Sequence, residues 1–131
     1  MIKINNTIKN LLNITDLVLL DIKHINTEKC KHLTGFNNSL ELEFANYLSD
    51  NNIPIWIRQV IIPGYTDSIN DLKELKKFIS NLKSVKKIEL LPYHKKGIYK
   101  WENLNLKYEL TTVREANDND IKKVKKILGI S

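Results

Sequence analysis

Residues 53–62 read Ile53-Pro54-Ile55-Trp56-Ile57-Arg58-Gln59-Val60-Ile61-Ile62, and this stretch decides the fold class. It is rich in β-branched residues, which favour a strand, and Pro63-Gly64 then ends it. Two shorter apolar runs flank it in the chain, one at 17–20 and one at 87–91, closed by Pro92. Both are typical of short buried strands.

Helical periodicity separates the three strand-like runs. It precedes the first run, follows Asn38 and Ser39, follows Ser68 with a capping box to Asp71, and resumes from about Asp118. The expected inward residues are Ile4, Ile8, Leu11, Leu12, Leu40, Phe44, Tyr47, Leu48, Ile69, Leu72, Leu75, Ile79, Leu82, Ile121, Val124, Ile127 and Leu128, with Gly129 as the last C-terminal cap. This order predicts an α/β fold with three parallel strands, either half a barrel or a small open sheet.

Composition narrows the class of protein. The 131 residues suit one domain or part of one, and the formal net charge is +6. The lysines fall mostly on polar helix faces and there are only two arginines, so nucleic-acid binding is disfavoured. No apolar run reaches the length of a membrane span and residues 1–10 lack a signal-peptide core, so we expect a cytoplasmic protein.

Polar residues stand near the carboxyl end of each predicted strand, where parallel α/β proteins bind ligands. Asp21 and Lys23 share a face after the first strand, Arg58 interrupts the second, and His94 follows the third. Each also has a plain structural explanation: a solvated pair, a salt bridge from Arg58 to Asp21 or Glu89, and an exposed histidine. Together they predict a site for a zwitterionic or anionic small ligand.

The stretch from Tyr93 to about Asn117 has no clear period and contains Tyr99, Trp101 and Tyr108. Loops of this length are often functional. Two interpretations remain equal: a functional loop, or a surface strap whose aromatic residues pack on the fold.

Several ordered motifs resemble pyruvate formate-lyase activating enzymes. They are Thr15-Asp16-Leu17-Val18-Leu19-Leu20-Asp21-Ile22-Lys23-His24, Leu33-Thr34-Gly35, Ile53-Pro54-Ile55-Trp56-Ile57-Arg58, Ile62-Pro63-Gly64-Tyr65-Thr66-Asp67, and Glu89-Leu90-Leu91-Pro92-Tyr93-His94 with Gly97, Tyr99, Lys100 and Trp101. The resemblance runs from about Leu11 to Leu128. It implies the C-terminal half of a partial (β/α)6 radical S-adenosylmethionine barrel, with 1–131 as one partial domain.

The resemblance also implies a cofactor site. In that family S-adenosylmethionine binds a [4Fe-4S] cluster, and the radical it yields takes hydrogen from a glycine of the partner enzyme. By resemblance, Asp21 would hold a monovalent cation near the methionine carboxylate, Ile22 would supply backbone along the ligand, and Lys23 would reach the carboxylate. Arg58 would line the same mouth, and His94 would contact the cofactor.

One departure from the family is large. The cluster needs a Cys-x3-Cys-x2-Cys motif, and this chain has one cysteine, Cys30. We therefore expect no radical activity from this polypeptide alone, and a missing N-terminal half that carries the cluster. The expected partner is a glycyl-radical enzyme, with pyruvate formate-lyase favoured. Ranked behind the activating enzyme are a non-catalytic module that docks such a partner or the missing half, and then a basic nucleic-acid binder.

Overall fold

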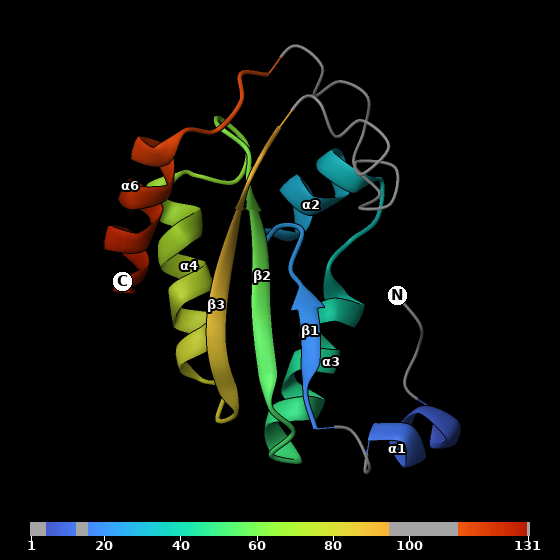
Figure 1. The fold of residues 1–131 in the computed structure, drawn as a ribbon. Helices are drawn as coiled ribbons and strands as arrows, with labels where there is room; N and C mark the ends of the chain where they lie inside the picture. Colours follow the sequence, from blue (N-terminus) through green and yellow to red (C-terminus); the bar gives the residue numbers. More distant parts are fainter. Residues whose placement is uncertain (1–4, 13–15, 95–112, 131) are drawn as a thin grey trace.

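The computed structural model describes residues 5–12, 16–94 and 113–130 (Figure 1). Within them the elements follow in the order α1 (Asn6–Leu12), β1 (Val18–Asp21), α2 (Thr27–Thr34), α3 (Ser39–Asp50), β2 (Ile55–Ile61), α4 (Ile69–Ser80), β3 (Val85–Pro92) and α6 (Asp118–Leu128). Among these helices, none is both long enough and apolar enough to span a bilayer.

The three strands form one parallel sheet in the order β1-β2-β3, with β2 at its centre. Helices flank the sheet, and α6 packs against α4 on the β3 side (Figure 1). The predicted α/β class with three parallel strands and flanking helices is therefore confirmed. Because β1 and β3 are the outer strands, each leaves one edge without a partner strand in the described part of the chain.

Helices cover one face of the sheet most completely along its central strand, β2. Along β2, Ile55, Ile57 and Ile61 are buried, whereas the alternate residues Trp56 and Arg58 are only half-buried. The buried face meets apolar side chains from the helices, which include Leu48, Leu72, Leu75, Val124 and Leu128. Residues of the opposite face keep access to solvent, and that face carries the charged groups.

The expectation that the first strand is buried throughout is wrong. Leu20 is 5% exposed, but its neighbour Leu19 is 51% exposed. The reason is that successive side chains of a strand point to opposite faces and only one face is covered. In α3, Leu40 was also expected to face inward, but it lies in the first turn of the helix and is 38% exposed, whereas Leu48 lies within the core.

Helix α2 is an element that the sequence patterns did not predict. The side chain of Asn26 caps its start by accepting a hydrogen bond from the Lys29 amide at 3.0 Å, and Gly35 ends it with φ +87°. Only Cys30 and Leu33 are buried along its length. Two buried residues give too weak a helical period to be recognised in the sequence.

The predicted helix caps were partly correct. Gly129 ends α6 with φ +72°, and Ser68 caps α4 by accepting from the Asp71 amide at 3.2 Å. Asn38 stands at the start of α3, but its side chain makes no cap hydrogen bond there. It instead donates to the backbone oxygens of His24 and Ile25, which ties α3 to the turn after β1.

The long segment after β3 is described only at its two ends. Tyr93 is buried and packs with Leu33 and Ile62 at the carboxyl end of the sheet. Tyr99, Trp101 and Tyr108 lie outside the described residues. The two interpretations of this segment both stay predictions.

Candidate functional site

An ion pair between Asp21 and Arg58 forms the centre of the candidate site. Asp21 is the last residue of β1 and stands directly opposite Arg58 of β2 in the sheet register. The arginine Nε is buried and lies 2.9 Å from the Asp21 Oδ1, without an aligned hydrogen bond between them. Of the two partners considered for Arg58, Asp21 is therefore the one in contact.

Lys23 joins the same carboxylate from the turn that follows β1. Its Nζ lies 3.7 Å from the Asp21 Oδ2, and its side chain is 15% exposed. Its backbone is also held, because its amide donates to Glu41 Oε2 and its carbonyl accepts from Gln59 Nε2, each at 3.3 Å. Asp21, Lys23 and Arg58 thus form one cluster, with two cations around one carboxylate.

Ile22 lies between these charged residues and faces the core. Its side chain is 1% exposed, and its amide donates to the Arg58 carbonyl at 2.9 Å. The sheet therefore extends one residue past β1 in hydrogen bonding. This extension fixes the separation of Asp21 and Lys23 on the open side of the sheet.

Burial changes the titration of the acid beneath Lys23. Burial raises the pKa of the Glu41 carboxyl, while the hydrogen bond from the Lys23 amide acts in the opposite direction. Glu41 belongs to α3, so this contact also joins the helix layer to the site. The Glu41 carboxyl group thus holds the backbone of Lys23, whereas the Lys23 ammonium group lies near Asp21.

The third strand adds a further charge at the same level of the sheet. Glu89 of β3 stands opposite Arg58 in the register, so Asp21, Arg58 and Glu89 form a row across the sheet. Neighbouring strands are about 4.8 Å apart, so the row spans about 10 Å. Its signs alternate, which suits a ligand that carries both charges.

His94 lies just past β3, and one of its contacts is with Glu115. Its Nδ1 is 3.4 Å from Glu115 Oε2, and its side chain is 59% exposed. The structure thus places His94 at the carboxyl end of the sheet with a partner from the segment before α6. Its expected contact with the cofactor stays a prediction.

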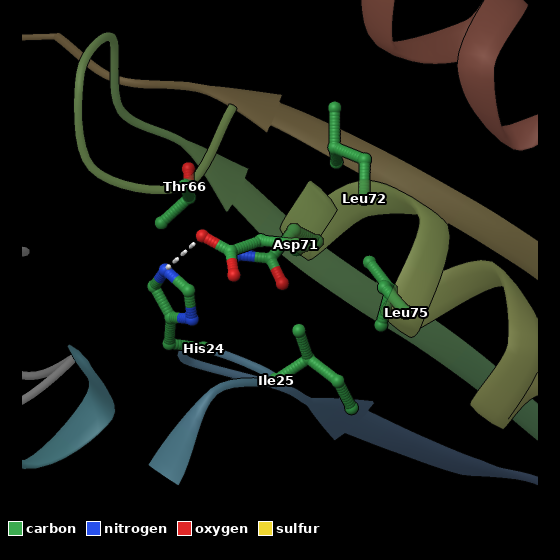
Figure 2. A pocket seen from close by; sticks show the side chains of 7 residues that line it. His24, Ile25, Thr66, Asp71, Leu72 and Leu75 are labelled. Atoms are coloured by element: carbon green, nitrogen blue, oxygen red, sulfur yellow. Dashed lines mark ion pairs between the residues drawn. The ribbon is translucent and has the colours of Figure 1, made fainter. Parts of the chain in front are cut away.

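A buried histidine near the site was missed in the sequence. His24 is 2% exposed and follows Lys23 directly. With Gln59, Thr66 and Asp71 it lines a small cavity of about 10 Å³, which has room for no more than a single water molecule (Figure 2). No local signal separates a buried histidine from an exposed one, because its partners come from distant parts of the chain.

The chain's residues do not match a cysteine-held cluster. Cys30, its one cysteine, is fully buried and contacts the Thr34 hydroxyl, and burial raises the pKa of its thiol. Across residues 5–12, 16–94 and 113–130, no group of three or more His, Cys, Asp or Glu side chains is arranged to hold a metal ion. The charged cluster, by contrast, matches the charges of an amino-acid moiety.

These features define a parallel α/β protein with a charged site at the carboxyl ends of its strands. The pyruvate formate-lyase-activating enzymes of Staphylococcus aureus strains USA300 and NCTC 8325 are each 49% identical to it over 108 residues, which are 82% of this chain and 43% of theirs. The chain thus spans less than half the length of these curated relatives. No family model matches the chain.

A solved structure agrees in fold. The crystal structure of a domain of pyruvate-formate lyase-activating enzyme from Bacteroides vulgatus superposes with a TM-score of 0.75 at 20% identity, and the match covers 94% of this chain and 67% of that one. The chain belongs to the pyruvate formate-lyase-activating enzyme family. The resemblance inferred from the sequence motifs is confirmed.

Proposed function

We propose that this chain is the S-adenosylmethionine-binding part of a radical activating enzyme that installs a glycyl radical on a partner enzyme, and that the chain alone is inactive. The observation that carries the proposal is the cluster of Asp21 with Arg58 at 2.9 Å and Lys23 at 3.7 Å. It stands in a chain that is 49% identical to named activating enzymes.

The charges of the cluster suit the methionine end of S-adenosylmethionine, which carries an ammonium and a carboxylate. In the proposal, Lys23 and Arg58 bind the carboxylate, and Asp21 holds a monovalent cation beside it. Arginine is suited to this because its planar fork binds carboxylates in two places. The Ile22 backbone lies along the ligand, and His94 contacts the cofactor from the end of β3.

When bound beside a reduced [4Fe-4S] cluster held by other sequence, S-adenosylmethionine would supply the radical chemistry that removes a hydrogen from a glycine of the partner, while Asp21, Lys23 and Arg58 of this chain would hold its methionine end. Three thiolate ligands for that cluster must come from other sequence, because this chain has one buried cysteine. In the proposal, the residues of this chain bind and orient the methionine end. The proposed partner is a glycyl-radical enzyme, with pyruvate formate-lyase favoured, and the proposed location is the cytoplasm.

Ligand binding by the isolated chain tests the proposal. Isothermal titration with S-adenosylmethionine is compared for the wild type, Lys23→Met and Arg58→Met. Loss of one charged hydrogen-bonding partner is expected to weaken binding roughly tenfold or more. Lys73→Met, an exposed lysine of α4, is the matched control and should leave binding unchanged. Absence of binding to the wild type would reject this role.

A second candidate is a module that docks a glycyl-radical enzyme, or a separate N-terminal half, without chemistry. It is favoured by the single cysteine and by the outer edge of β1, which has no partner strand among the described residues and whose Leu19 is 51% exposed. Size-exclusion chromatography with pyruvate formate-lyase distinguishes the two. Co-elution together with no binding of S-adenosylmethionine would favour the docking module.

A further inference from the structure

We propose that His24, held as the Nε2-protonated imidazole, is a positioning residue that fixes Lys23 in the candidate site. It does so by joining the turn after β1 to the loop after β2. That Lys23 binds a ligand rests on the proposed function, whereas the hydrogen bond by which His24 joins the two segments does not.

The hydrogen bonds of the ring determine its tautomer. The Asn26 amide donates to His24 Nδ1 at 3.0 Å, so Nδ1 carries no proton. The proton is therefore on Nε2, which donates to the Tyr65 carbonyl at 2.7 Å. The ring is 2% exposed, and burial lowers its pKa, which keeps the neutral form at physiological pH.

The acceptor at Tyr65 belongs to a tightly ordered loop. The amides of Tyr65 and Thr66 both donate to the Ile62 carbonyl, at 2.9 and 3.0 Å. The Thr66 hydroxyl accepts from the Ile62 amide and donates to the Val60 carbonyl, each at 2.8 Å. The Tyr65 carbonyl is thus a fixed point to which the imidazole is anchored.

His24 connects this loop to the turn after β1, which contains the backbone of Lys23, His24 and Ile25. The carbonyls of His24 and Ile25 accept from Asn38 Nδ2 at 3.0 and 2.8 Å. The Lys23 amide and carbonyl are already bound by Glu41 and Gln59. With the backbone held on both sides, a ligand that binds Lys23 has only the side chain left to order.

Asp71 of α4 supports the same tautomer, because its carboxylate lies near the nitrogen that carries the proton. Its Oδ2 lies 3.7 Å from His24 Nε2, and Figure 2 shows the imidazole and the carboxylate pointing toward one another. The same oxygen accepts from Lys29 Nζ at 2.5 Å and from Ser68 Oγ at 2.7 Å. Its negative charge favours a proton on Nε2, while Lys29 opposes a second proton on the ring.

Two variants and one spectroscopic readout test the positioning role. His24→Leu removes both ring contacts at similar volume, and His24→Gln keeps an amide donor for the Tyr65 carbonyl. His32→Gln, an exposed position on α2, is the matched control and assigns the ring signals. Ring nitrogen NMR of the wild type at pH 7.5 should show His24 protonated only on Nε2.

Two further measurements separate positioning from general stability. In His24→Leu, hydrogen exchange of the Lys23 amide should speed up at least tenfold relative to the amides of β2. S-adenosylmethionine affinity should fall roughly three- to tenfold, because binding must then also order the Lys23 backbone, which the wild type already holds. His24→Gln should restore both values to within about twofold, because it preserves the donor.

The outcomes decide the proposal in each case. A proton on Nδ1, a charged ring at pH 7.5, or unchanged Lys23 exchange in His24→Leu would overturn it. An affinity loss equal in both variants, and no larger than their loss of folded protein, would also overturn it by showing a purely structural role. If the wild type binds no S-adenosylmethionine, the proposed function fails. The tautomer and the exchange rates then still test whether His24 positions Lys23.

Discussion

Replacing Asp71 by asparagine removes a negative charge that lies close to Lys29, Ser68 and His24. The carboxylate is 7% exposed and accepts from Lys29 at 2.5 Å and from Ser68 at 2.7 Å. Hydrogen bonds to a charged group contribute about 1.5–3 kcal/mol, but Lys29 is 52% exposed and its share is discounted to below about 1 kcal/mol. We expect Asp71→Asn to lower the free energy of unfolding by about 2 kcal/mol at pH 7.

The effect should depend on pH with a definite sign. Burial raises the pKa of Asp71, but the hydrogen bonds from Lys29 and Ser68 outweigh it, so the net pKa is below the ordinary 3.8. An acid with a depressed folded-state pKa adds stability above its unfolded pKa and loses that stability as pH falls through the folded pKa. The difference between wild type and variant should therefore shrink below about pH 3.8.

Urea unfolding followed by circular dichroism at pH 7, 5 and 3 measures this difference. For a chain of this size the variant should also melt roughly 6–8 °C lower at pH 7. Lys29→Met is the matched control and should cost below about 1 kcal/mol, with the double variant giving the coupling between the two residues. A difference under about 0.5 kcal/mol at pH 7, or one that stays constant down to pH 3, would refute this reasoning.

Three other perturbations have clear expected outcomes. Leu48→Ala, at a fully buried site, should cost about 2–5 kcal/mol in urea unfolding, whereas Leu19→Ala, at a position 51% exposed, should stay within about 0.5 kcal/mol; similar costs would contradict the one-sided core. Gly35→Ala should lower the free energy of unfolding by about 1–2 kcal/mol, because φ is +87° there. No atom lies near the added methyl group, so the backbone conformation alone sets this cost; a neutral result would argue against the left-handed cap. Arg114→Met should raise the pKa of Asp120 from about 2 toward 3.8 in a carboxyl NMR titration, because the guanidinium hydrogen bond that lowers it is lost; an unmoved pKa would remove Arg114 as the cause.

The strands of this fold could be predicted because their signals are local. The β-branched run around Ile57 and the apolar runs at 17–20 and 87–91 needed no knowledge of the rest of the chain. Arg58 could be predicted to need a partner, since an arginine in an apolar strand is rarely buried alone. The sequence left two candidates for that partner, and the register selected Asp21.

The missed features depend on contacts between distant residues. His24 is buried against a distant part of the chain: its ring donates to the Tyr65 carbonyl, which stands 41 residues away. Asn38 stands where a helix cap is expected, but its side chain donates to backbone oxygens 13 and 14 residues earlier. Neither contact has a spacing that sequence periodicity detects, so both are seen only in the folded structure.

The row of Asp21, Arg58 and Glu89 across the sheet has a consequence for how the strands assemble. A slip of β2 by one residue against its neighbours would turn Arg58 toward the helix-covered face, among side chains such as Leu20 and Leu72. An unpaired charge there is strongly unfavourable. We therefore expect the same charges that suit a ligand to select the alignment of the strands during folding, well before any ligand arrives.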